Sequence, residues 1–231
     1  MVEDDVIWKP VSLTFVEYPQ GDLLGKLLAY LSLTPIFILV GFCAILLFRR
    51  ELHTITFLAG LVLNEAVNWT AKHLIKEPRP VRGHEGFGEY GMPSSHSQFM
   101  FFFAVYIILF ICIRLHQPTS SCFIDNIWRI LIGFGVVILA IIVSYSRIYL
   151  LYHTTSQVLC GALLGIILAI PWFFLTHVVF TPFFPWVVSW GVSEYFMIRD
   201  STLIPNILWF EYTTARTEAR QRNRKLSSKS Q

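Results

Sequence analysis

The sequence predicts an all-α protein, a polytopic bundle of membrane-spanning helices, and two observations support this prediction. Charged residues make up only 14% of the 231 residues and hydrophobic residues 55%, whereas soluble domains are roughly a quarter charged. The apolar residues also gather in runs of roughly 20, the length that a helix needs to cross a bilayer. A chain of this length is expected to form one domain. We therefore predict a single transmembrane bundle with about five spans, four to six being possible.

Five apolar runs have the length of a spanning helix, and polar connections separate them. A tight basic connection, with the sequence RRELH, joins the first two runs. Longer or more polar connections separate the others. The five predicted spans cover residues 27–48, 54–75, 97–115, 127–146 and 157–180.

The chain after the fifth run is rich in aromatic residues but is a poor candidate for a sixth span. Residues 182–198 are interrupted by Pro185 and carry Glu194, a pattern typical of an interfacial or re-entrant segment. The basic, polar C-terminus is expected to lie in water. The predicted organisation is an N-terminal segment, a transmembrane core, an interfacial or re-entrant segment and a basic tail, at residues 1–26, 27–180, 181–213 and 214–231.

The distribution of positive charge predicts how the bundle is oriented. With five spans, the connection 49–53 and the C-terminal tail lie on the same side, and both are rich in Lys and Arg. That side is therefore expected to be cytosolic, and the N-terminal segment and the connections 76–96 and 147–156 face the opposite side. The net charge of +3 is too small and too unevenly spread to indicate a nucleic-acid partner.

Three polar clusters lie on the side opposite the cytosolic one, where positive charge is not favoured. The first contains Lys72, followed after six residues by Arg79 and Pro80; the second is Pro-Ser-Ser-His at 93–96. The third begins with Ser146 and Arg147 and ends, after five more residues, at His153. Cations, hydroxyls and the N–H groups of a helix start are the groups that hold a phosphate. The sequence therefore predicts a phosphate site at the membrane surface.

Two histidines in such a site can divide the chemistry of phosphoryl transfer. One can attack phosphorus while the other protonates the leaving oxygen. No group of carboxylates accompanies His96 and His153, so the sequence gives little support to a metal-assisted reaction. We expect neither a metal ion nor a cofactor.

These spacings resemble the type-2 phosphatidic acid phosphatase superfamily, whose motifs are Lys-x6-Arg-Pro, Pro-Ser-Gly-His and Ser-Arg-x5-His. The three motifs occur here in order, over residues 72–157. The resemblance implies a transmembrane helix bundle in which His153 is the nucleophile and His96 the general acid. It also implies that phosphate is bound by Lys72, Arg79, Ser94, Ser95 and Arg147.

Longer stretches resemble the members of that superfamily that act on dolichyl diphosphate. They are EPRP, YGMPSSHSQFM, VSYSRIYLLYHTTSQV and LIPNILWFEYT. This resemblance implies hydrolysis of a polyprenyl diphosphate lipid, dolichyl diphosphate, to the monophosphate through a phosphohistidine. It implies a role in recycling the lipid carrier of protein N-glycosylation, at a site facing the lumen of the endoplasmic reticulum. Two alternatives stay open: a phosphatase of phosphatidate or an isoprenoid phosphate, and an inactive membrane scaffold.

The sequence departs from the superfamily pattern at two positions. Ser95 stands where the family has glycine, and Gln157 stands where the family usually places an aspartate four residues after the nucleophile. If the segment is helical, Gln157 lies on the same face as His153, so its amide oxygen can accept a hydrogen bond from Nδ1–H and fix the tautomer. Gln157 brings no charge to stabilise an imidazolium.

A polar stripe on the second predicted span has two interpretations. Asn64, Asn68 and Lys72 recur every four residues, so they share one helix face. The stripe can form hydrogen bonds between helices, or it can line the pocket, with Glu65 as a partner for a cation.

Overall fold

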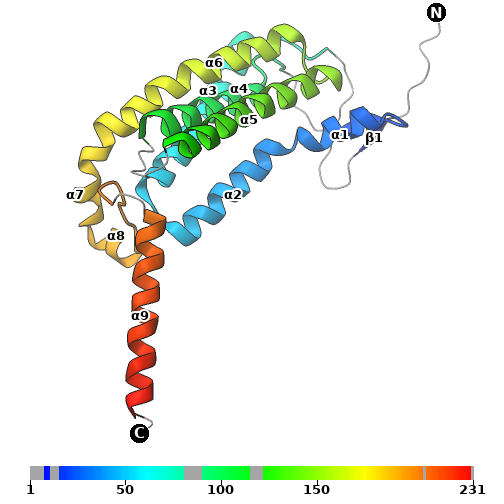
Figure 1. The fold of residues 1–231 in the computed structure, drawn as a ribbon. Helices are drawn as coiled ribbons and strands as arrows, with labels where there is room; N and C mark the ends of the chain where they lie inside the picture. The colour runs from blue at the N-terminus through cyan, green and yellow to red at the C-terminus, as the bar shows by residue number, and fades with distance from the viewer. Residues whose placement is uncertain (1–7, 11–15, 81–89, 115–121, 205–206, 230–231) are drawn as a thin grey trace, which may run out of the picture.

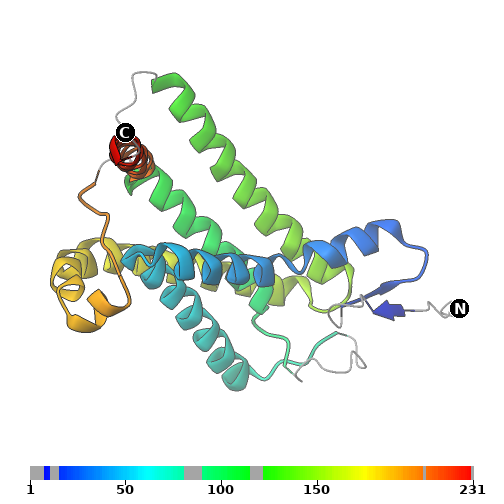
Figure 2. The ribbon, with the colours of Figure 1, turned by 90° about the horizontal axis from the view of Figure 1, so that it is seen from below.

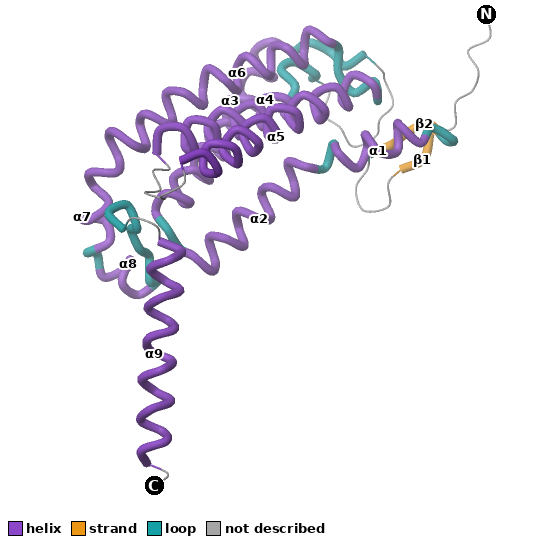
Figure 3. Tube along the Cα trace, viewed as in Figure 1, coloured by secondary structure: helices purple, strands orange, loops and turns teal. Residues whose placement is uncertain are grey.

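The prediction of an all-α bundle is confirmed by the computed structural model, which describes residues 8–10, 16–80, 90–114, 122–204 and 207–229. Figure 1 shows long helices stacked side by side, with a last helix that points away from them. Strand structure in the described part is confined to the antiparallel pair β1 (Trp8–Pro10) and β2 (Glu17–Pro19). Loops lie beside the start of α6 and between α7 and α9, and shorter ones connect other elements, such as α1 and α2 (Figure 3).

The first predicted span is two helices rather than one. The helix α1 (Leu23–Leu31) stops before Ser32, and α2 (Thr34–Arg49) starts after Leu33. Hydroxyl groups bond back to the end of α1: Ser32 Oγ donates to Ala29 O at 2.7 Å and Thr34 Oγ1 to Leu31 O at 2.6 Å. Pro35 in the first turn of α2 has no N–H with which to continue the α1 hydrogen-bond ladder. These local bonds explain the break inside an apolar run.

The remaining predicted spans correspond to helices, with shifted ends. They are α3 (Leu52–Ile75), α4 (Ser95–Leu109), α5 (Cys122–Tyr149) and α6 (Thr155–Phe174). A π-helical turn extends α4 over Phe110–Arg114, and another extends α6 over Leu175–Phe180. Parts of two predicted connections, residues 81–89 and 115–121, lie outside the described residues.

The chain is a multi-pass membrane protein. Four stretches of the described part are long and apolar enough to cross a bilayer: Leu23–Arg49, Ser95–Ile113, Ile127–Tyr149 and Thr155–Val188. The helix α3 is not among them, because polar side chains such as Asn64 and Asn68 interrupt its apolar sequence. Its 24 residues measure about 36 Å at 1.5 Å per residue. It packs against α2, α4 and α6, so we count it as the fifth crossing.

The core of the bundle is built by large apolar side chains from α3, α4, α5 and α6. Phe57 of α3 stacks on Tyr106 of α4 with their ring centroids 4.0 Å apart, and Phe173 of α6 meets the edge of the same tyrosine ring at 5.4 Å. The outward faces are also apolar, with Phe48 and Ile130 among the exposed side chains. Lipid tails are the surroundings that such an exterior fits.

The helices α4 and α6 approach so closely that their backbones touch. A Cβ at Gly161 would lie 2.5 Å from Ser94 O, and a Cβ at Gly165 would lie 2.3 Å from Gln98 O. Small residues permit such contact between membrane helices. Ser97 reinforces it, since its Oγ donates to Val158 O at 2.9 Å. The start of α4 is thereby held against the start of α6.

The chain after α6 folds into short pieces and one long helix. Residues 182–198 contain most of η3 (Thr181–Phe183) together with α7 (Phe184–Val188) and α8 (Gly191–Tyr195), each too short to cross a bilayer on its own. The predicted boundary between segment and tail, at 213 and 214, falls inside α9 (Ile207–Lys229). This helix points away from the bundle in Figure 1 and is seen end-on in Figure 2.

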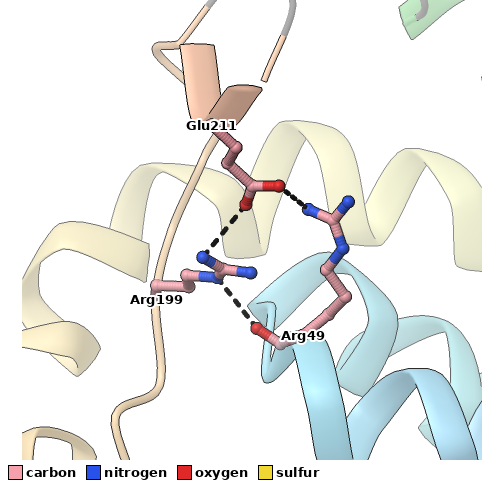
Figure 4. Close-up of polar contacts among 3 residues, drawn as sticks. All are labelled: Arg49, Arg199 and Glu211. Carbon is pink, nitrogen blue, oxygen red and sulfur yellow. Dashed lines mark hydrogen bonds and ion pairs between the residues drawn. The ribbon is translucent and has the colours of Figure 1, made fainter. Parts of the chain in front are cut away.

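An ion-pair triad attaches the start of α9 to the end of α2. Glu211 lies between two arginines, with Oε2 at 2.6 Å from Arg49 Nη1 and Oε1 at 3.1 Å from Arg199 Nη1. Arg199 Nε also donates to the backbone oxygen of Arg49 at 2.9 Å (Figure 4). The basic connection 49–53 and the root of the tail therefore lie at the same end of the bundle.

Candidate active site

The segments that carry the three motifs meet at one end of the bundle. Ser94 N–H, at the start of α4, donates to Gln157 O in the first turn of α6 at 3.1 Å. Asn68, near the end of α3, donates from Nδ2 to Pro93 O at 3.3 Å. His153 N–H donates to Arg147 O in the last turn of α5 at 3.1 Å. The predicted convergence of the motifs is therefore present in the fold.

The first turn of α4 leaves a hydroxyl and backbone N–H groups available to a ligand. Ser94 is the N-cap residue, but its side chain makes no capping hydrogen bond. Its buried Oγ has no hydrogen-bond partner among the residues that the structure describes. Ser95 and His96 follow in the first turn, partly exposed. A helix N-terminus with an uncommitted hydroxyl is suited to an anion.

Arg147 presents buried donors at the same place. Its side chain is 1% exposed, and its guanidinium carbon lies 4.0 Å from the centre of the Tyr152 ring. Within the described part, Nε and Nη1 of Arg147 have no hydrogen-bond partner. Buried polar groups are normally satisfied, so these nitrogens indicate a site for an anion. Our sequence analysis missed Tyr152, which stacks against the guanidinium and holds it in place.

A tight turn after α5 positions His153. Leu151 has a left-handed backbone, with φ of 59°, which allows the N–H groups of Tyr152 and His153 to donate to Arg147 O at 3.0 and 3.1 Å. His153 therefore precedes α6 instead of lying within it, since that helix starts at Thr155. The turn fixes the imidazole next to the guanidinium of Arg147.

Electrostatics keep His153 uncharged. Its side chain is only 2% exposed, and this burial, followed by the charges of Arg147 and Arg79, lowers its pKa to about 3. Each effect disfavours the protonated imidazole. At neutral pH His153 therefore keeps a ring nitrogen with a free lone pair, as a nucleophile requires.

Gln157 contacts His153 as the sequence predicts, and its amide makes three further hydrogen bonds. Oε1 lies 3.2 Å from His153 Nδ1 and accepts from Thr154 N–H at 3.3 Å. Nε2 donates to Glu77 Oε1 at 2.8 Å and to Pro78 O at 2.9 Å. If the amide were turned by 180°, its NH₂ group would face the Thr154 N–H, and its oxygen would face the acceptors Glu77 Oε1 and Pro78 O. The amide oxygen thus faces His153, Nδ1 carries the proton, and Nε2 is free to react.

Glu77 and Gly91 are parts of this arrangement that our sequence analysis did not find. Glu77 O accepts from Gly91 N–H at 2.7 Å, and a Cβ at Gly91 would lie 2.6 Å from Gln157 Oε1. The only signal in the sequence was a carboxylate two residues before the arginine of the first motif. Because Gln157 lies 66 positions after Gly91 and 80 after Glu77, spacing alone does not predict their contacts with it.

The polar stripe of α3 forms hydrogen bonds between helices. Gln98 of α4 donates from Nε2 to Asn64 Oδ1 at 2.9 Å and accepts from Asn68 Nδ2 at 2.7 Å. Both asparagines are buried. The first interpretation of the stripe is therefore correct for Asn64 and Asn68. Lys72 lies further along the stripe, and the charges of Arg79, Glu65 and Arg147 act on it.

The titratable groups of the predicted site lie close enough to interact electrostatically. Arg147, Lys72, Arg79 and His153 all act on His96 in this way. The structure therefore brings together both predicted histidines and all three predicted cations. Ser94 and Gln157 join them through the contacts described above.

An apolar groove of about 590 Å³ opens beside His96. Apart from Ser95, His96 and Glu65, its lining is apolar, with side chains from α2, α3 and α4. It does not include His153. The groove therefore adjoins the His96 side of the site, and it is lined by Pro35, Ile36, Leu39, Leu61, Val62, Glu65, Ala66, Trp69, Ser95, His96 and Phe99.

Comparison with known proteins finds a family and several close relatives. A family model described as the PAP2 superfamily matches residues 53–182. "Dolichyldiphosphatase 1" of Homo sapiens is 58% identical over 97% of this chain and 95% of its own length. "Dolichyldiphosphatase 1" of Dictyostelium discoideum is 40% identical over 93% and 92%. "Lipid phosphate phosphatase gamma" of Arabidopsis thaliana is 42% identical over 90% and 91%.

A solved structure agrees with the fold. It is a transmembrane PAP2-type phosphatidylglycerolphosphate phosphatase from Bacillus subtilis, similar at a TM-score of 0.53 over 66% of this chain and 76% of that one, with 19% sequence identity. The family model covers more than half of the chain and includes all three motifs. The chain belongs to the PAP2 superfamily.

Proposed function

We propose that this protein is an integral membrane phosphatase that hydrolyses dolichyl diphosphate to dolichyl phosphate and phosphate. The observation that carries the proposal is the set of buried donors without partners in the described part, on Arg147 and Ser94, beside an uncharged His153. A phosphate group would satisfy these donors and lie next to a nucleophile. The identity to proteins named dolichyldiphosphatase, 58% over 97% of the chain, supports the choice of lipid.

The reaction proceeds in two steps that share one intermediate. Nε2 of His153 attacks the terminal phosphorus, the bond to the bridging oxygen breaks, and His96 gives a proton to the departing dolichyl phosphate. His96 then removes a proton from water, which attacks the phosphohistidine and releases phosphate. Both histidines end in their starting states.

Cations and helix dipole stabilise the transferring phosphoryl group. Lys72, Arg79 and Arg147 supply positive charge that also acts on His153. Ser94, Ser95 and the N–H groups of α4 add hydrogen bonds at the helix start. With three long cations at the site, the reaction has the charge that a metal ion would otherwise provide.

The apolar groove suits the isoprenoid chain of the substrate. In an in-line reaction the leaving group departs on the side opposite the nucleophile. The groove adjoins His96 and Ser95 but not His153, so a chain lying in it would place the leaving oxygen near the general acid. Its apolar walls match a hydrocarbon ligand.

The site is proposed to face the lumen of the endoplasmic reticulum, with the N-terminal segment lumenal and the basic tail cytosolic. Arg49 and Arg50 lie at the end of α2, the end to which Glu211 attaches α9. The lysines and arginines of the tail follow in the same helix. The positive-inside rule places this end in the cytosol, and the motif-bearing ends of α3 and α5 at the other face.

A second candidate is a phosphatase of other lipid phosphates, which the Arabidopsis relative named lipid phosphate phosphatase gamma favours. The third hypothesis, an inactive scaffold, has little support because every charged residue of the three motifs is present. Phosphate release from purified protein decides among them, with dolichyl diphosphate, dolichyl phosphate, phosphatidate and farnesyl diphosphate as substrates. We expect dolichyl diphosphate to give the highest kcat/KM and His153→Gln to abolish release. Preference for phosphatidate would favour the second candidate, and no release from any lipid the third.

A further inference from the structure

We propose that Glu77 is a positioning residue that delivers its negative charge to His153 through the amide of Gln157. This inference rests on the proposed function, in which His153 attacks phosphorus. The three groups form a chain of two hydrogen bonds: Glu77 Oε1 to Gln157 Nε2 at 2.8 Å, and Gln157 Oε1 to His153 Nδ1 at 3.2 Å. A carboxylate is thus linked to His153 through one intervening amide, at the position where the family usually has an aspartate.

Further contacts hold both residues of this link, Glu77 and Gln157. Glu77 O accepts from Gly91 N–H at 2.7 Å, and the next residue pairs with Tyr90 in a short bridge. Gln157 is completely buried and closes a capping box with Thr154. The backbone that carries each end of the link is therefore held in place.

The charge matters when the phosphohistidine forms. As the bond from Nε2 to phosphorus forms, the imidazole, which keeps its Nδ1 proton, becomes positively charged. A carboxylate that accepts from the amide N–H makes the amide oxygen a stronger acceptor, so Nδ1–H is bound more tightly in the transition state. Glu77 remains ionised and no proton leaves the chain. Because the ground state has a neutral imidazole, the effect appears in kcat more than in KM.

The competing explanation is that Glu77 only fixes the backbone that carries Arg79. Glu77→Gln separates the two explanations, because an amide oxygen at this position still accepts from Gln157 Nε2 while the charge is lost. Glu194→Gln is the matched control: Glu194 is an exposed glutamate of α8, outside the site. Both variants remove one negative charge from the molecule.

The exchanged pair Glu77→Gln with Gln157→Glu gives the sharper test. Gln157→Glu alone sets two carboxylates against each other across the present 2.8 Å contact, so it should impair activity. In the double variant one carboxylate and one amide face each other again, with the carboxylate now in contact with Nδ1–H. The exchange restores the contact between positions 77 and 157 but not the bond to Pro78 O, which now accepts from Gln157 Nε2 at 2.9 Å. We therefore expect the double variant to recover activity above that of Gln157→Glu alone, which two independent losses of structure would not do.

The expected result is a fall in kcat on the order of tenfold for Glu77→Gln, the lower end of the range for groups that support a ligand through another residue. KM should change less than about twofold, and Glu194→Gln should match wild type. Equal kcat for Glu77→Gln and Glu194→Gln would overturn the proposal. So would a double variant no better than the worse single variant.

Vanadate binding distinguishes failure of this inference from failure of the proposed function. Orthovanadate bonded to the histidine imitates the five-coordinate transition state, and its binding, measured by calorimetry, needs no lipid turnover. Glu77→Gln should weaken vanadate binding on the order of tenfold while leaving binding of inorganic phosphate nearly unchanged. If wild type hydrolyses no lipid but this difference persists, the proposed function fails and the proposed role of Glu77 stands. If wild type hydrolyses dolichyl diphosphate and the difference is absent, only the proposed role of Glu77 fails.

Discussion

Replacing Gly91 by alanine should impair His153 indirectly, by displacing the amide of Gln157. Gly91 has no positive φ, so alanine is compatible with its backbone. The added methyl group would lie 2.6 Å from Gln157 Oε1 and 2.8 Å from Nε2, whereas ordinary contacts start at 3.4 Å. The amide must therefore move by about 0.8 Å.

A displacement of that size is enough to break the contact with His153. The Oε1 to Nδ1 distance is already 3.2 Å, and a hydrogen bond is lost near 3.6 Å. His153 would lose the partner that fixes its tautomer, and misplacements of about 1 Å in a reactive group cost up to about 100-fold in rate. We expect kcat to fall about 10-fold to 100-fold while KM changes little.

The assay is phosphate release from dolichyl diphosphate by purified protein, with thermal unfolding followed in parallel. Gly41→Ala is the matched control, because a Cβ at Gly41 of α2 would have no neighbour within 4 Å. The control should be as active as wild type. A Gly91→Ala protein whose kcat stays within twofold of the control would refute the reasoning that Gln157 orients His153.

Three further predictions concern pH, metal ions and orientation. The pKa of His153 is about 3 in the folded protein, against 6.5 for an unperturbed histidine. Between these two pH values the histidine is protonated in the unfolded chain but not in the folded one. The free energy of unfolding should therefore fall as pH drops from 6.5 towards 3. Denaturant unfolding against pH checks this, and an equally steep fall in His153→Gln would contradict it. Activity should survive excess EDTA, because Lys72, Arg79 and Arg147 supply the positive charge at the site; loss of phosphate release that Mg²⁺ restores would show otherwise. Protease added to sealed microsomes should remove an epitope placed after Gln231, and a protected epitope would place the tail in the lumen.

The parts of the fold that follow from local sequence were predictable. All five apolar runs are helical, the first as two helices, because length and composition largely decide whether a segment is stable in lipid. The break between α1 and α2 was not predicted, since it depends on side-chain bonds from Ser32 and Thr34 that hydropathy does not register. The third span was predicted to begin at 97, whereas α4 begins at Ser95, so its first turn already contains the polar residues of the second motif.

The sequence predicted which motif residues would come together at the candidate site, but not the residues that support them. His96, His153 and the three cations stand in spaced motifs, so the sequence alone indicated their chemistry. Glu77, Gly91 and Tyr152 act through contacts set by tertiary structure, for which spacing gives no signal. The contact of Gln157 with His153 lies between the two cases: the four-residue spacing suggested it, although His153 proved to lie in the turn before α6 and not in the helix.

The backbone contact between α4 and α6 fixes the distance between the segments that carry His96 and His153. One helix start carries His96 and the other follows His153, and at Gly161 and Gly165 no side chain separates the two backbones. No substitution can bring the helices closer, and any larger residue at those glycines would push them apart. The spacing of the segments that carry His96 and His153 is therefore set by main-chain atoms. If the groove holds the isoprenoid chain as proposed, adaptation to a longer, shorter or more branched lipid is left to the side chains of α2 and α3 that line it.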